Sequence, residues 1–431
     1  MVTATSTYLQ DLLAGRTQLP ASPLAWLNRL RAEAVDRVSA LTVPTTRDEE
    51  WRFTDLSPLT RTSFQPARQR SQLRLADIEQ HLLPETGARL VFVDGVYAPQ
   101  LSATDAGGGV TLQNLGTPNA PAAMLEPHLG RHAAFRDNVF AALNTAFLHD
   151  GALIVVPPDA VLERPLHLLF VATQAAAIYP RCLLVAGARS AVTVIEDYVA
   201  LADSAYFNDA VTEIAVADAA RVEHVRVQRE AASAFHIADC AVALAQGSRY
   251  RSTGIAFGAR LSRYNLNVTQ HAEGAECTID GLALIGGQQL ADTHSCIDHA
   301  RPHGVSRQLH KCIAGGAAHA VFNGKVLVRP GAQLTDSAQS SRNLLLSGRA
   351  HVDTKPQLEI FADDVKCAHG ATVGQIDSEE LFYLKSRGLP EETARNLLTY
   401  AFGAEIIERI PVASLRQRLA RTVLTRTAEP S

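Results

Sequence analysis

A stretch of more than 200 residues, from about Ala152 to Gly374, constrains the fold most strongly because it is rich in strand signals and carries no clear helix signal. Short β-branched or alternating apolar runs cover residues 153–156, 166–171, 192–195, 222–227, 264–268 and 325–328. A doubly wound α/β sheet needs a helical crossover between consecutive parallel strands. The stretch therefore leaves a β-sandwich or a β-solenoid as its fold.

The corners between these runs are small and nearly periodic. They comprise Gly187-Ala188, Gly258-Ala259, Gly274-Ala275, Gly316-Ala317, Gly331-Ala332 and residues 348–350, and three of the later gaps are 16, 15 and 17 residues. Such corners are typical of a chain in which each turn stacks on the one before it, so we favour a parallel β-helix over a sandwich. Its inward-facing apolar ladder is expected to include Val192, Val194, Leu266 and Val268.

Helical periodicity precedes the β-rich stretch, and residues 1 to about 85 look helical. After Ser22-Pro23, which suits an N-cap and first helical position, apolar residues recur at helical spacing from Leu27 to Leu41. A second helix is predicted over residues 135–148. Between these helices, Trp51 and Phe53 lie among charges (RDEEWRFTD) and are interpreted as an anchor for an extended arm.

The helical period returns after Gly374. One helix is predicted to open at Pro390 and to carry an apolar stripe of Ala394, Leu397, Leu398, Ala401, Phe402 and Ile406; a last helix presents Leu415, Leu419 and Val423. We therefore predict a mainly β protein with three domains: an N-terminal helical or mixed domain (1–150), a parallel β-helix core (151–376) and a C-terminal helical domain (377–431).

Composition narrows the class of protein. Of the 431 residues, 47% are hydrophobic and 19% are charged, and the net charge of −4 argues against a nucleic-acid partner. Neither a secretory signal nor an apolar run of membrane-spanning length is evident, so we expect a soluble cytoplasmic protein without a membrane span. The six cysteines form no C-x-x-C pair and are expected to be thiols.

Standard catalytic motifs are missing from the sequence. There is no phosphate-binding G-x-x-x-x-G-K-[ST] loop, and G-x-S-x-G, H-E-x-x-H and G-x-G-x-x-G are also absent. We therefore do not expect this chain to hydrolyse ATP itself.

Two concentrations of histidine and cysteine are candidate metal sites. Cys367 and His369 lie two residues apart, so in a strand they share a face and could offer sulfur and nitrogen to zinc or iron. Two ligands do not close a tetrahedral site, which predicts a half-site completed across an interface or by exogenous ligands.

The other concentration comprises His294, Cys296, His299, His303, His310 and Cys312. It leaves open a β-helix zinc enzyme built on His294, His299 and His303; a β-helix polysaccharide lyase or hydrolase is a further alternative.

Several segments resemble one family. The run KPQLEIFADDVKCAHGATVGQI (355–376), followed by LFYLKSRGLP (381–390), is similar to the C-terminal signature of the SufD branch of the SufB/SufD family, which belongs to the SUF iron–sulfur cluster assembly machinery. The C-x-H-G-A-T-x-G string distinguishes that branch from SufB. Further matches lie at residues 49–55, 140–147, 293–311, 322–328 and 338–347, so the resemblance spans nearly the whole chain.

The resemblance implies a right-handed parallel β-helix flanked by helical domains and a non-catalytic scaffold function. It implies pairing with a SufB-like paralogue, with the nascent iron–sulfur cluster, or iron, shared at their interface, and binding of a SufC-like ABC ATPase through the C-terminal helices. The family's histidine falls on His369, with Cys367 beside it. Reduced flavin in the complex and a homodimer of the isolated chain are further expectations.

Overall fold

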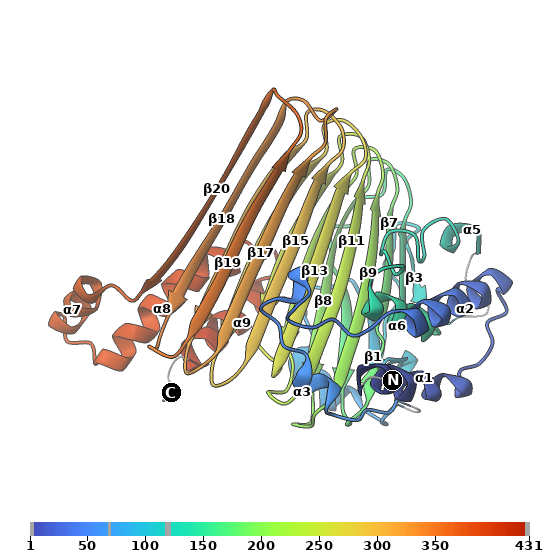
Figure 1. The fold of residues 1–431 in the computed structure, drawn as a ribbon, viewed down its shortest axis with the longest axis horizontal. Helices are drawn as coiled ribbons and strands as arrows, with labels where there is room; N and C mark the ends of the chain where they lie inside the picture. The colour runs from blue at the N-terminus through green and yellow to red at the C-terminus, as the bar shows by residue number, and fades with distance from the viewer. Residues whose placement is uncertain (1–3, 68–69, 117–121, 427–431) are drawn as a thin grey trace.

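The computed structural model describes residues 4–67, 70–116 and 122–426 and shows a parallel β-solenoid of about eight turns between two helical regions (Figure 1). Strands account for 40% of the structure and helices for 23%, which confirms the mainly β class. None of the helices in these residues is long and apolar enough to cross a membrane.

Two long sheets form the walls of the solenoid, and we name each after its last strand. The β20 sheet runs in the order β2 (Val96–Tyr97), β1 (Ala88–Val93), β5 (Leu166–Ala172), β8 (Ala191–Ala200), β10 (Arg221–Arg229), β12 (Arg249–Ala256), β14 (Glu276–Ile285), β16 (Val305–Ala314), β18 (Thr335–Leu345) and β20 (Val365–Gln375). The β19 sheet runs in the order β19 (His351–Ile360), β17 (His319–Val328), β15 (Leu290–His299), β13 (Leu261–Gln270), β11 (Phe235–Leu244), β9 (Phe207–Val216), β7 (Arg181–Ala186), β4 (Ala152–Val156) and β3 (Thr111–Asn114), and β6 (Ala177–Ile178) also pairs with β9.

Successive turns stack in parallel register. Val222 is paired with Val192 on the turn before it and with Tyr250 on the turn after it, so the chain advances about 30 residues per turn. Each turn contributes one strand to each sheet, and the 15–17-residue spacing of the sequence corners is therefore half a turn. The predicted β-helix is confirmed. The sandwich alternative is wrong because consecutive strands from β7 to β20 alternate between the two sheets and pair in parallel; the antiparallel pairs β1–β2 and β3–β4 lie before that.

The interior of the solenoid contains one large apolar cluster, in which the predicted ladder residues Val192, Val194, Leu266 and Val268 are all buried. Polar side chains are also buried inside, in the early turns as well as in the late ones. In the early turns, Glu196 of β8 contacts the Nε2 of His224 of β10 (2.9 Å). Gln308 of β16 accepts a hydrogen bond from Gln339 of β18 (2.8 Å) and bonds Ser295 of β15, and all three side chains are buried. The amide nitrogens of both glutamines are thus hydrogen-bonded inside the solenoid, as buried polar groups usually are.

Most helices of the N-terminal region cover the outer face of the β19 sheet, while Ile78 and Leu101 pack on β1, β5 and β8 of the β20 sheet. The longer helices of the region are α1 (Ala4–Ala14), α2 (Ala25–Ala40) and α6 (Val139–Ala146), and its short ones are η1 (Gly15–Gln18), η2 (Glu49–Trp51), α3 (Ser57–Thr60), α4 (Leu75–Ile78), η3 (Glu79–His81), η4 (Pro99–Leu101) and α5 (Ala122–Leu125). Side chains of α1, α2 and α6 share an apolar cluster with Phe207, Phe235 and Leu261 of the sheet.

Residues 41–56, the N-terminal arm, contain only the short η2 helix, so the expectation that residues 1–85 are largely helical was wrong here. Strand β1 pairs in parallel with β5, so the β20 sheet begins before residue 100.

Both predicted N-terminal helices exist but are shorter than expected. The Oγ of Ser22 accepts from the N–H of Leu24 (3.2 Å), so Ser22 caps the turn before the helix, and α2 begins at Ala25. The Asn138 side chain accepts from the N–H groups of Phe140 and Ala141, which fixes the start of α6 at Val139.

The C-terminal helices are α7 (Ser378–Ser386), α8 (Glu391–Ile407) and α9 (Ala413–Arg426). Helices α8 and α9 cover the outer face of the β20 sheet, whereas α7 buries no residue and projects away from it (Figure 1). The predicted apolar face of α9 is confirmed because Leu415, Leu419 and Val423 are buried against the sheet. The predicted face of α8 is only partly right, since Ala394 and Ile406 are buried while Leu397 is exposed. Gly403 of α8 lies against Leu282 and Ile313 of the sheet, so the face in contact is rotated from the predicted one.

Candidate functional site

The last turn of the solenoid is open. Among the described residues, β19 pairs only with β17 and β20 only with β18, so both are edge strands (Figure 1). No residue of either strand is fully buried, whereas nine of the ten residues of β11 are. An edge strand presents unpaired backbone N–H and C=O groups, to which another chain can add strands.

Cys367 and His369 both lie on β20 and face the interior at this open end. Their register partners on β18 are Ser337 and Gln339, whose side chains are buried inside the solenoid. Parallel strands in register place paired side chains on the same face. His369 thus continues the polar interior column of Gln308 and Gln339, but no further turn covers it, and it is exposed.

The two side chains differ in environment. Cys367 packs beside Val326 and Val328, and burial raises the pKa of its thiol, against a smaller opposing effect of a backbone hydrogen bond from Ser337. A thiol with a raised pKa is protonated at neutral pH and behaves as a small apolar side chain. His369 is the more accessible of the two as a ligand.

The residues between 294 and 312 do not form one site. His294 points outward and forms ion pairs with Glu50 (3.4 Å) and Asp292 (3.1 Å). His299 is buried inside the solenoid, where its Nε2 contacts the Oγ of Ser306 (2.9 Å). His303 occupies a corner with φ of 59° and lies 3.5 Å from Glu273. The zinc enzyme based on His294, His299 and His303 is therefore wrong.

Within the described part of the chain, one group of three potential metal ligands does converge: His319, His351 and Asp353. Sequence reasoning missed it because its histidines are 32 residues apart. The signal that finds them is the register, which pairs His319 of β17 with His351 of β19 one turn later.

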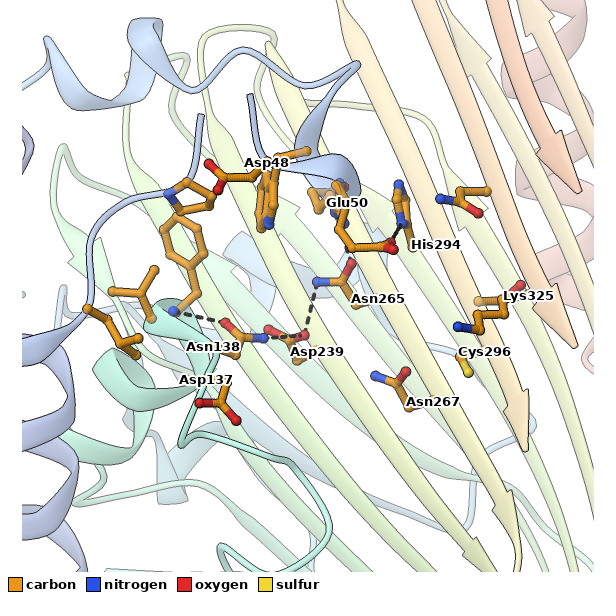
Figure 2. A pocket seen from close by; sticks show the side chains of 18 of the residues that line it. Asp48, Glu50, Asp137, Asn138, Asp239, Asn265, Asn267, His294, Cys296 and Lys325 are labelled. Atoms are coloured by element: carbon orange, nitrogen blue, oxygen red, sulfur yellow. Dashed lines mark hydrogen bonds and ion pairs between the residues drawn. The ribbon is translucent and has the colours of Figure 1, made fainter. Parts of the chain in front are cut away.

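A cavity of about 580 Å³ lies between the N-terminal arm and the outer face of the β19 sheet (Figure 2). Several of the polar groups that line it bond one another: the Oδ1 of Asp239 accepts from Asn138 (3.0 Å) and from Asn265 (2.9 Å). Lys325 pairs with Glu359 (2.7 Å), and burial raises the pKa of the Cys296 thiol to about 11. The cavity therefore has neither an activated thiol nor a free lysine.

The arm is anchored at the edge of this cavity. The Arg263 guanidinium lies 4.0 Å from the centre of the Trp51 ring, donates to the backbone oxygen of Glu50 (2.7 Å) and pairs with the buried Asp292 (2.6 Å). The Thr54 hydroxyl donates to the same carboxylate. The interpretation of Trp51 as an anchor is confirmed, and the cation–π contact and the buried ion pair explain its position among charges.

Comparisons with known proteins agree with this architecture. The family model described as the SufBD core domain of SUF system FeS cluster assembly matches residues 169–402, and the model of the SufBD protein N-terminal region matches residues 2–168. The chain belongs to the SufBD family. Its open solenoid and helical ends are thus those of an iron–sulfur cluster assembly protein.

The proteins similar in sequence to this SufBD family member include SufD of two bacteria. A SufBD family iron–sulfur cluster assembly protein of Synechocystis sp. is 43% identical over 92% of this chain and 90% of its own length. The iron–sulfur cluster assembly protein SufD of Escherichia coli is 33% identical over 88% of each chain, and SufD of Bacillus subtilis is 25% identical over 93% of each chain. The resemblance to SufD drawn from the sequence is confirmed.

Proposed function

We propose that this chain is a non-catalytic scaffold subunit that pairs with a SufB-like paralogue through its open last turn and helps to build the nascent cluster at the shared interface. The observation that carries the proposal is the position of His369. It lies on the inner face of an edge strand, at the end of the interior column, where a partner that extends the sheets would enclose it.

His369 is the proposed ligand, and it needs a partner. An imidazole is a borderline ligand suited to iron, but Cys367 beside it is protonated and partly packed into the solenoid. The partner would then supply the thiolate and carboxylate ligands and the sulfur. Reduced flavin in the complex, a homodimer of the isolated chain and a cytoplasmic location stay predictions from the sequence.

Substitution of His369 tests this role. We expect His369→Ala, co-expressed with the SufB-like and SufC-like subunits, to purify as an intact complex with at least about 10-fold less iron and cluster absorbance, because a ligand position is lost. Iron analysis and absorbance spectra measure the effect. His303→Ala, at an exposed corner of the same solenoid, is the matched control. A variant complex with normal cluster content would contradict the ligand role.

The C-terminal helices are proposed as the binding site of the SufC-like ABC ATPase. Helix α7 exposes Phe382 and Tyr383 to solvent by 73% and 60%, which is unusual for large apolar side chains unless a partner covers them. Two ion pairs fasten the C-terminal end of α8 to the solenoid: Glu405 of α8 pairs with Lys311 (2.5 Å), and Arg409, two residues after the helix, pairs with Asp280 (2.6 Å). A nucleotide-driven movement of the ATPase would thus be transmitted to the β20 sheet as a rigid-body motion.

Introduction of a negative charge into the exposed apolar surface of α7 tests the ATPase contact. We expect Phe382→Glu to weaken binding of the SufC-like subunit at least about 10-fold, since large aromatic side chains dominate interface energies. Affinity is measured by co-purification and calorimetry. Met124→Glu, at an exposed position of α5 in the N-terminal region, is the control. Equal binding by both variants would place the ATPase elsewhere, and it would leave the His369 experiment unaffected.

A further inference from the structure

Three side chains converge on the outer face of the β19 sheet, one turn apart. His319 begins β17 and His351 begins β19, and the two are paired in register; Asp353 follows two residues later on the same face of β19. Figure 1 shows these strands at the open end of the solenoid. His369 belongs to the opposite sheet and faces the interior, so this group is separate from the site proposed above.

The ligand atoms of the three residues are close enough to share one ion. The Nε2 of His319 lies 2.7 Å and the Nε2 of His351 lies 3.2 Å from the Oδ2 of Asp353, and the three ligand atoms lie within 4.8 Å of one another. An ion bound at about 2.1 Å by each ligand would separate the ligand atoms by roughly 3.0–3.4 Å. Small rotations of the side chains therefore suffice to place an ion between them.

The burial and the charges around His319, His351 and Asp353 also favour binding of a cation. His319 and Asp353 are each about three-quarters buried (28% and 25% exposed side chains), so their positions are set by the sheet, whereas His351 is open to solvent. Lys355, two residues after Asp353 on the same face of β19, is paired with Glu49 of the N-terminal arm (2.9 Å). Its charge is thus offset, and the open side of His351 leaves room for further ligands.

We propose that His319, His351 and Asp353 bind one divalent first-row transition-metal ion, iron(II) or zinc. Two imidazole nitrogens and one carboxylate oxygen suit these ions and exclude magnesium and calcium, which prefer oxygen ligands alone. Such a three-ligand set leaves coordination positions open, so the ion is exchangeable or can accept a ligand from a partner bound at the edge strand β19. The competing explanation is a trio held only by hydrogen bonds to Asp353.

Metal binding by the purified chain tests the proposal. We expect cobalt(II), a spectroscopic probe for both ions, to bind with one ion per chain and to give ligand-field absorption bands. We expect His319→Ala and Asp353→Asn each to weaken the affinity at least about 10-fold. His303→Ala and His369→Ala are expected to bind as the wild type does, and the latter separates this site from the proposed cluster site. Circular dichroism confirms that each variant is folded.

Competition assays then identify the ion. Under anaerobic conditions, zinc and iron(II) are each expected to displace cobalt from the wild-type chain, whereas a 100-fold excess of magnesium is not. Zinc is also expected to raise the melting temperature of the wild type but not of Asp353→Asn. Absence of stoichiometric cobalt binding to the wild type, or unchanged affinity in both ligand variants, would show that the trio is only a hydrogen-bonded cluster.

Discussion

Replacing Glu213 with alanine should lower the free energy of unfolding by about 3–5 kcal/mol, because it leaves a buried arginine without its counter-charge. Glu213 on β9 and Arg181 on β7 form an ion pair in which neither side chain is exposed. Burial alone would raise the pKa of Glu213, but Arg181 and backbone N–H groups outweigh it and lower the pKa. The carboxylate is therefore charged at neutral pH.

Glu213 also joins the solenoid to the N-terminal region. Its Oε2 accepts from the N–H of Gly130 (2.8 Å), and its Oε1 accepts from the N–H groups of Arg131, His132 and Ala133. Alanine at this position removes all four hydrogen bonds, and buried N–H groups without partners are costly. The segment before α6 is thus expected to loosen in the variant.

Urea denaturation followed by circular dichroism measures the loss of stability, and hydrogen exchange at residues 130–133 measures the local loosening. The matched control is Glu276→Ala, which removes the exposed partner of Arg249 and is expected to cost at most about 1 kcal/mol. Similar losses in both variants would show that the buried pair contributes no more than a surface pair does.

The strands that could be predicted from sequence are those whose inward positions are apolar. The runs around Val192 and Leu266 alternate visibly, and both belong to the interior cluster. Strand β18 escaped the pattern because its inward positions, such as Gln339 and Ser341, are polar and hydrogen-bonded inside the solenoid. Hydrophobic periodicity cannot detect a strand whose core is made of amides and hydroxyls.

Some features of the candidate sites could likewise be predicted from the sequence, and others could not. The strand and shared face of Cys367 and His369 follow from local spacing, since side chains alternate along any strand. That alternation also separates His294, which points outward, from His299, which is buried inside, so proximity in sequence was misleading there. The pairing of His319 with His351 depends on the exact length of one turn, which the corner spacing gives only approximately.

Acid should destabilise the protein well above the pH at which carboxylates are protonated, because burial lowers the pKa of histidines such as His310. This side chain is buried on the inner face of β16 and stacks on Phe322, with ring centroids 4.4 Å apart. Burial lowers its pKa to about 3, against a smaller opposing effect of Asp292. An unfolded histidine titrates near pH 6.5.

The direction of the pH effect on stability follows from the pKa of His310 in the folded chain, about 3, and in the unfolded chain, near 6.5. Between pH 6.5 and about 3, the unfolded chain binds a proton at His310 and the folded chain does not, so stability falls as the pH falls. The slope contributed by this residue approaches about 1.4 kcal/mol per pH unit. We expect the wild type to lose roughly 2–3 kcal/mol through His310 alone between pH 6.5 and 4.5.

Substitution with glutamine isolates this contribution. His310→Gln keeps a polar side chain at the site but cannot take up a proton, so its stability should fall less steeply between pH 6.5 and 4.5, by roughly 2–3 kcal/mol over the interval. Urea midpoints at several pH values measure the slope. His303→Gln, at an exposed corner, should keep the wild-type slope. An unchanged slope in His310→Gln would mean that the interior accepts a protonated imidazole. The charge of that imidazole would then be stabilised by water inside the solenoid or by the Asp292 carboxylate, since an unpaired buried charge is costly.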